Sequence, residues 1–78
     1  PMTTIEFELP QAAQARLDVF DVRGRRVRRL VDARLSSGTH TFTWDGKDGE
    51  HNVLPSGVYF YRLHTEALML VRKMVMAR

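Results

Sequence analysis

Alternation of apolar and polar residues recurs along the whole chain and constrains the fold more than any other feature. In TTIEFEL, residues 3–9, Ile5, Phe7 and Leu9 alternate with threonine and glutamate. Successive side chains of a β-strand point to opposite faces, so this pattern predicts one buried and one solvated face. Pro10 lacks a backbone donor and predicts the end of the strand.

Several further runs favour strands, and turn residues separate them. These runs are ARLDVFDV at residues 15–22, the stretch from Arg26 to Val31, THTFTWDG at 39–46, GVYFYRLHTE at 57–66 and LMLVRKMVMAR at 68–78. DARLSSGTH is expected to be a polar connection, and NVLPSG adds a short apolar pair. No gap holds a crossover helix, so about seven short strands in an antiparallel sandwich or barrel are predicted.

The chain has 78 residues and is too short to build two separate cores, so it is expected to form one domain. Its composition, 44% hydrophobic and 27% charged, is near the globular average and favours a packed core. Without cysteine it has no thiolate zinc site, iron–sulfur cluster or catalytic thiol. It starts at PMTTIEFELP with no signal-like segment, and we expect a piece excised from a longer protein.

Five arginines fall within the eight residues of RGRRVRRL, residues 23–30. Gly24 lies between charged residues and predicts a tight turn with a positive φ. A nucleic-acid surface gathers its cations on one face. These arginines fall on both sides of a strand, with Asp18, Asp21 and Asp32 close by in the sequence. We therefore expect a solvated strand face rather than a nucleic-acid interface.

The stretch DGKDGEHN, residues 45–52, offers Asp45, Asp48 and Glu50 as oxygen donors for calcium. Its order of acids and glycines differs from that of an EF-hand loop. Asp and Gly also supply the backbone angles that β-turns need. A turn is favoured over a calcium site.

No catalytic or metal motif stands out. His40, His51 and His64 occur singly, without the short spacing of a zinc motif. The serines lie in loops that lack the glycines of a nucleophile elbow, and no glycine-rich phosphate loop is present. We expect neither enzymatic activity nor a bound metal or cofactor.

The aromatic residues are predicted to lie mainly in the core. Phe42 and Trp44 alternate with threonines, which places them on one buried face together with His40. Tyr59 and Tyr61 fall on one face of their strand with Leu63, and Phe60 falls on the other. An exposed sugar-binding platform is the alternative.

Taken in order, five segments carry a resemblance: TTIEFELP, LDVFDVRGRRVRRLVD, LSSGTHTFTWDGKD, PSGVYFYRL and RKMVMAR. Together they resemble the type A C-terminal sorting domain of type IX secretion, to which the flagellar hook-capping Ig-like domain is similar. The resemblance implies a compact Ig-like antiparallel β-sandwich. It further implies a single C-terminal sorting and attachment domain, residues 1–78, that follows a secreted enzyme or adhesin.

The resemblance also implies partners and a location. The partners would be the outer-membrane secretion translocon and the lipopolysaccharide attachment machinery. The location would be secreted, at the outer-membrane cell surface of a Gram-negative bacterium. We expect a monomer that binds no nucleic acid and does not span a membrane.

The family motifs carry a receptor or sorting role to residues near the C-terminus. In SGVYFYRL and RKMVMAR these are Gly57, Tyr59, Tyr61, Lys73, Met74 and Val75. An exposed final strand could then be extended by a receptor strand, since edge strands have unpaired backbone groups.

Two other function classes stay open from the residues. One is a carbohydrate-binding module of an extracellular polysaccharide-degrading enzyme, with exposed aromatics and calcium at Asp45 and Asp48. The other is an Ig-like spacer without a ligand. A sorting signal requires the natural chain end at Arg78, and the other two do not.

Overall fold

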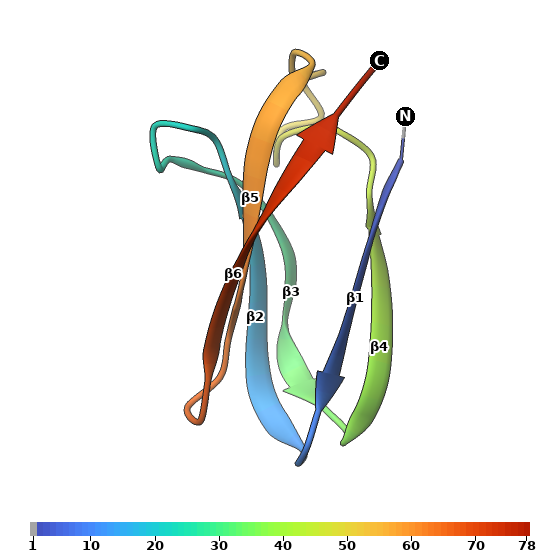
Figure 1. The fold of residues 1–78 in the computed structure, drawn as a ribbon, viewed down its shortest axis with the longest axis vertical. Coiled ribbons are helices and arrows are strands. Elements are labelled where there is room, and N and C mark those ends of the chain that lie inside the picture. The colour runs from blue at the N-terminus through green and yellow to red at the C-terminus, as the bar shows by residue number, and fades with distance from the viewer. Residues whose placement is uncertain (1) are drawn as a thin grey trace.

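The computed structural model describes residues 2–78, which form two antiparallel sheets that face each other (Figure 1). The strands are β1 Thr3–Leu9, β2 Ala13–Phe20, β3 Arg26–Leu35, β4 Gly38–Trp44, β5 Gly57–His64 and β6 Met69–Met76. One sheet pairs β1 with β4, and the other has the order β3-β2-β5-β6. The predicted all-β antiparallel sandwich is confirmed. It has six strands instead of about seven, because the NVLPSG segment makes only an isolated bridge between Val53 and Lys47.

One apolar core fills the space between the sheets. Ile5, Phe7 and Leu9 are all buried, as their alternation predicts. Trp44, at the end of β4, is fully buried and is the largest side chain of the core. The remaining buried apolar residues are Ala15, Leu17, Val19, Val31, Tyr59, Leu63, Met74 and Met76.

The outer face of the β1–β4 sheet is entirely polar. Its cross-strand pairs are Thr4 with Thr43, Glu6 with Thr41 and Glu8 with Thr39, and all six residues are exposed. The opposite face carries Phe7 next to His40 and Ile5 next to Phe42. The rings of His40, Phe7 and Phe42 form a cluster, with the His40 centroid 5.7 Å from that of Phe7 and 6.5 Å from that of Phe42. The shared face predicted for His40 and Phe42 is confirmed.

β3 is longer than the sequence suggests. It continues past Val31 to Leu35, and only Ser36 and Ser37 separate it from β4. The expected polar connection DARLSSGTH was therefore wrong over its first half. The reason is non-local, because Ala33 and Leu35 pair with Ala15 and Ala13 of β2.

The connection between β2 and β3 is the predicted tight turn. Gly24 has a φ of +80°, in the left-handed region that glycine adopts without strain. The Asp21 carboxylate accepts the backbone N–H groups of Arg23 and Arg25 at 2.9 and 3.0 Å. The pairing of β2 with β3 also shifts register between Leu17 and Asp18 and again between Val19 and Phe20, as at a β-bulge.

The loop from 45 to 54 is organised by two aspartates that act as turn acceptors. Asp45 Oδ1 accepts the N–H of Lys47 at 3.0 Å. Asp48 Oδ1 accepts the N–H groups of Glu50 and Asn52, both at 2.9 Å. Both carboxylates are therefore engaged in the turn, as the Asp-Gly steps predict.

Acid should weaken this loop. The pKa of Asp48 is held below its ordinary value, mainly because the carboxylate accepts the N–H of Asn52. A lowered folded pKa stabilises the protein above the unfolded pKa of about 4, and this stability is lost as the pH falls through the folded pKa. We expect Asp48→Asn to reduce the melting temperature at pH 7. The gap to the parent should close as the pH falls below about 4.

Melting curves from pH 7 to pH 2 measure this effect, with the neighbouring exposed variant Glu50→Gln as the control. A gap between Asp48→Asn and the parent that stays constant over this range would refute the assignment.

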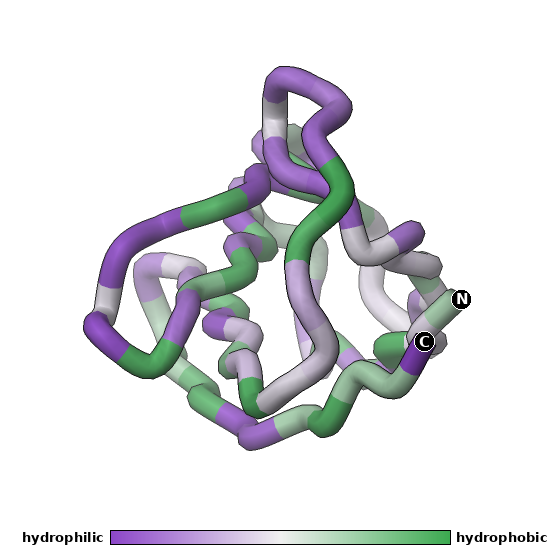
Figure 2. Tube along the Cα trace, turned by 90° about the horizontal axis from the view of Figure 1, so that it is seen from above, coloured by the Kyte–Doolittle hydropathy of each residue, from purple (hydrophilic) through white to green (hydrophobic). Residues whose placement is uncertain are grey.

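No helix of the described residues is long and apolar enough to cross a membrane. Viewed from above, the two ends of the described segment, residues 2–78, lie close together on one side of the sandwich (Figure 2). The loops 21–25 and 45–56 are the longest connections between strands, and the second leads directly into β5.

Candidate functional site

The β5–β6 hairpin brings together all the residues predicted to carry the sorting role. They are Gly57, Tyr59 and Tyr61 on β5 and Lys73, Met74 and Val75 on β6. Tyr59 lies opposite Met74, and Phe60 lies opposite Lys73. β6 pairs only with β5, so it is an edge strand of its sheet, as expected for the final strand.

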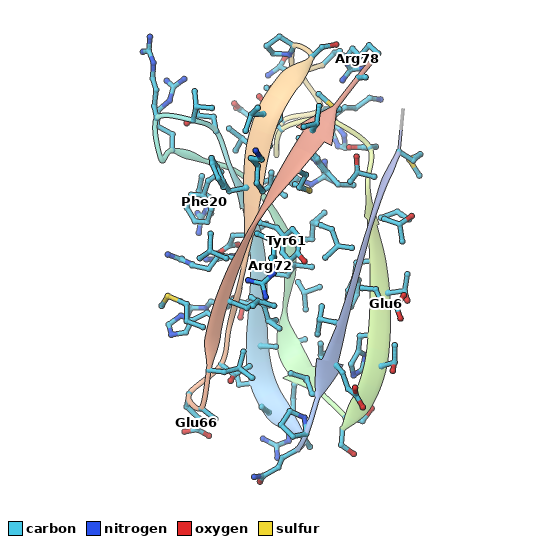
Figure 3. The ribbon with its side chains drawn as sticks, in the orientation of Figure 1. Glu6, Phe20, Tyr61, Glu66, Arg72 and Arg78 are labelled. Atoms are coloured by element: carbon cyan, nitrogen blue, oxygen red, sulfur yellow. The ribbon has the colours of Figure 1, made fainter. Side chains whose placement is uncertain are left out.

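These residues divide between the two faces of the hairpin. Tyr59 and Met74 point into the core and are 5% and 8% exposed. Tyr61 is half-buried on the same side, which faces β1 (Figure 3). Lys73 and Val75 are exposed on the other side. Their role in recognition stays a prediction.

Tyr59 has a clear structural task. Its ring meets the indole of Trp44 edge-on, with centroids 5.0 Å apart. Its hydroxyl donates to the carbonyl of Pro55 at 2.7 Å. The Trp44 Nε1–H donates to the carbonyl of Lys47 at 2.9 Å. The two aromatic residues therefore tie the 45–56 loop to the core, and the core assignment of both is confirmed.

The arginine-rich stretch is largely neutralised by ion pairs. Arg25 lies 2.9 Å from Asp21, and Arg28 lies 3.2 Å from Asp45. Arg28 also donates to the carbonyl of Lys47 at 3.1 Å, which connects β3 to the 45–56 loop. Asp21 is one of the aspartates that the sequence places near these arginines, whereas the Asp45 partner of Arg28 lies 17 residues away and was not predicted.

Asp18 is the residue that sequence reasoning missed. Its alternation with Leu17 and Val19 predicts exposure on the solvated face, and that prediction was wrong because Asp18 is fully buried. The Arg29 Nε donates to Asp18 Oδ1 at 2.9 Å, and Arg62 Nη2 lies 3.7 Å from Oδ2. The hydrogen bond to Asp18 raises the pKa of Arg29 above its ordinary value.

Arg29 and Arg62 reach Asp18 from the two neighbouring strands, β3 and β5. Arg62 also covers the ring of Phe20, with its guanidinium carbon 4.7 Å from the ring centroid. Asp18 is thus a buried carboxylate bridging three strands. Only the strand order reveals it, since these residues are far apart in the sequence.

The histidines and acids do not converge. Among residues 2–78, no three His, Asp or Glu side chains are placed to hold a metal ion together. The Nε2 of His40 is hydrogen-bonded to the carbonyl of Ser36 at 2.7 Å. Trp44, Tyr59 and Asp18 are likewise engaged, in packing, in hydrogen bonds to the 45–56 loop and in ion pairs.

Comparison with known proteins gives one consistent family. The FlgD Ig-like domain model matches residues 2–67. The basal-body rod modification protein FlgD of Salmonella typhimurium is 41% identical over 58 residues, which is 73% of this chain and 25% of that protein. The protein of the same name from Salmonella typhi matches to the same extent. The crystal structure of FlgD from P. aeruginosa matches with a TM-score of 0.77 at 24% identity, covering 97% of this chain and 60% of that one.

These findings correct the functional expectations drawn from the resemblance. The type IX sorting assignment is wrong, because the matching family and the curated relatives are flagellar. The expected partners, the secretion translocon and the lipopolysaccharide attachment machinery, are wrong for the same reason. So are secretion of a preceding enzyme, cell-surface attachment and the outer-membrane location.

The similarity to the flagellar Ig-like domain, which was part of the resemblance, is confirmed. The chain spans a quarter of the length of the curated relatives. The P. aeruginosa structure supports the Ig-like fold over nearly the whole chain. With a family match over residues 2–67 and 41% identity to the Salmonella protein, the chain belongs to the FlgD Ig-like domain family.

Proposed function

We propose that this chain is a non-catalytic structural module of a protein that modifies the flagellar basal-body rod. The observation that carries the proposal is the 41% identity to the Salmonella typhimurium basal-body rod modification protein. The identity extends over 73% of the chain, so it is not confined to one strand or turn. The absence of catalysis is an inference from the family.

The packing of the described residues supports a structural role. Trp44, Tyr59 and Asp18, which an enzyme could use chemically, are buried and engaged with neighbouring groups. The accessible surface of the described residues includes the outer faces of both sheets and the edge strand β6. Such surfaces suit contact with other proteins better than turnover of a small molecule.

We also propose that residues 1–78 are one domain of a longer protein. The matched relatives have three quarters of their length outside the region they share with this chain. The chain has its own core between two sheets, and its ends lie close together at one end of the sandwich (Figure 1). Adjacent termini are typical of domains that are inserted into or appended to longer chains.

A domain exchange in Salmonella tests the function. The matched segment of its FlgD is replaced by this chain, and swimming in soft agar is measured in a strain that lacks its own FlgD. An unrelated Ig-like sandwich of similar length is the control. We expect swimming with this chain and little or none with the control. Equal failure of both chimeras, with both produced as folded protein, would contradict the proposal.

A further inference from the structure

The two outer faces of the sandwich differ sharply. The outer face of β1 and β4 carries only threonine and glutamate. The outer face of β5 and β6 instead exposes Val58, Met69, Val71 and Val75, which are 36%, 58%, 51% and 67% exposed. The outer positions of β5 and β6 therefore do not follow the polar pattern of the outer positions of β1 and β4. Large apolar patches on a protein surface often mark interaction sites, so this face is a candidate for one.

A shallow hollow of about 300 Å³ lies at the edge of this apolar face. We call it the Phe20–Phe60 hollow, and it is lined by Phe20, Asp21, Val22, Gly24, Phe60, Arg62 and Val71. Val22 is 68% exposed at the β2–β3 turn and forms part of this lining. Phe20 lies on the side of the sheet that faces away from β1, opposite to Glu6 (Figure 3).

The accessible charge around the hollow is positive. Lys73 lies directly opposite Phe60 across the β5–β6 pairing, and Arg26 lies opposite Phe20 across the β2–β3 pairing. The nearby acids are already engaged. Asp18 is buried against Arg29, and the Asp21 carboxylate at the rim is 2.9 Å from Arg25. Lys73 and Arg26 thus lie beside the hollow, each opposite a phenylalanine of its lining, and neither has a carboxylate partner among the described residues.

We propose that the Phe20–Phe60 hollow docks a partner polypeptide segment in which apolar side chains are flanked by carboxylates. The apolar residues would fill the hollow, and the carboxylates would meet Lys73 and Arg26 at its two sides. Electrostatic complementarity of this kind selects partners and speeds association. The inference goes beyond the proposed flagellar role and does not rest on it.

Two other occupants fit the surface less well. Single-stranded nucleic acid needs exposed aromatic faces for base stacking, but Arg62 covers the ring of Phe20 at 4.7 Å. A second copy of this chain could present Glu6 and Glu8, but these lie among threonines with no exposed apolar neighbour on that face. A segment of another protein that combines apolar side chains with flanking carboxylates matches the hollow better.

The test is an NMR titration of the ¹⁵N-labelled chain with two blocked hexapeptides, Ac-EEVFEE-NH₂ and Ac-KKVFKK-NH₂. We expect the acidic peptide to shift the amide signals of Phe60, Arg62, Val71 and Lys73 saturably, with a Kd below about 1 mM. The basic peptide should produce no saturable shift. Raising the salt from about 20 to 200 mM should weaken binding several-fold, because the cations are exposed.

Matched variants distinguish binding at this hollow from a general effect of the net charge of the protein. Lys73→Glu should weaken the acidic peptide about tenfold, whereas Arg34→Glu makes the same charge change elsewhere on the sheet and should leave the Kd within about twofold. Val71→Ser tests the apolar part, and Val53→Ser, at an exposed valine outside the hollow, is its control. Because Val71 and Lys73 are tested separately, misfolding of one variant leaves the other informative.

Several outcomes would overturn the proposal. One is the absence of saturable shifts with the acidic peptide up to about 5 mM. Others are equal effects of both peptides, or equal weakening by Lys73→Glu and Arg34→Glu. Tighter binding of octathymidylate or of phosphatidylglycerol vesicles at the same amides would assign the hollow to nucleic acid or to lipid instead.

Discussion

Replacing Trp44 with alanine should lower the free energy of unfolding by about 3–5 kcal/mol, the range for removing a large aromatic side chain from a core. Trp44 is fully buried and meets Tyr59 edge-on at 5.0 Å. Its Nε1–H also donates to the carbonyl of Lys47, so the variant leaves that acceptor without its partner. A domain of this length has a total stability of about 4–12 kcal/mol. The loss is therefore a large fraction of the total stability of the domain.

Urea unfolding followed by tyrosine fluorescence and circular dichroism measures the loss for Trp44→Ala. Trp44→Phe keeps an aromatic ring and removes the donor, so it should cost less than the alanine variant. Phe42→Ala, on the same strand face but only half-buried, provides the comparison for position. A Trp44→Ala variant that loses less than about 1 kcal/mol would contradict the packing described for the core.

Replacing Asp18 with alanine should lower the free energy of unfolding by about 2–3 kcal/mol. Removing one partner of a buried ion pair usually costs about 3–5 kcal/mol, because the other charge is left uncompensated. The cost is lower here because the side chains of Arg29 and Arg62 are 33% and 35% exposed and can partly regain water. The loss would loosen β2 from β3 and β5 together, since Asp18 contacts an arginine on each.

Asp32→Ala is the matched control for this effect. Asp32 also pairs with Arg29, at 3.8 Å, but its side chain is 41% exposed. Exposed ion pairs contribute about 0–1 kcal/mol, so this variant should be close to the parent. Chemical denaturation of both variants measures the difference. Equal stability of Asp18→Ala and Asp32→Ala would show that burial of Asp18 does not have the assigned effect.

Local patterns predicted the strands well. The alternation of Ile5, Phe7 and Leu9 specifies which face of β1 is buried, whatever the strand pairs with. Gly24 and the Asp-Gly steps at 45–49 specify turns by their own backbone preferences. The core positions of Trp44 and Tyr59 followed from the same reasoning.

Features that depend on strand order could not be predicted from these patterns. Asp18 is buried only because Arg29 and Arg62 reach it from two neighbouring strands, and no local pattern indicates that pairing. The same holds for the second half of β3, which is stabilised by its alignment with β2. The Phe20–Phe60 hollow likewise joins side chains from β2, β5 and β6 with a turn.

The type IX assignment failed for a physical reason. The motif PSGVYFYRL, one of the five segments that carried the resemblance, consists largely of residues that build the sandwich. Tyr59 packs against Trp44 and binds the carbonyl of Pro55, and Leu63 is buried. Residues of this kind specify an Ig-like strand and its turn. They do not specify the pathway that uses the domain.

The recovery of this domain with basal bodies tests the proposed flagellar role most directly. The Salmonella FlgD chimera carries an epitope tag, and its abundance is measured in purified basal-body intermediates against the tagged native protein. The flagellar role predicts co-purification at a level comparable to that of the native protein, and little recovery for the chimera with an unrelated Ig-like domain. A folded, exported chimera that is found only outside the basal-body fraction would contradict it.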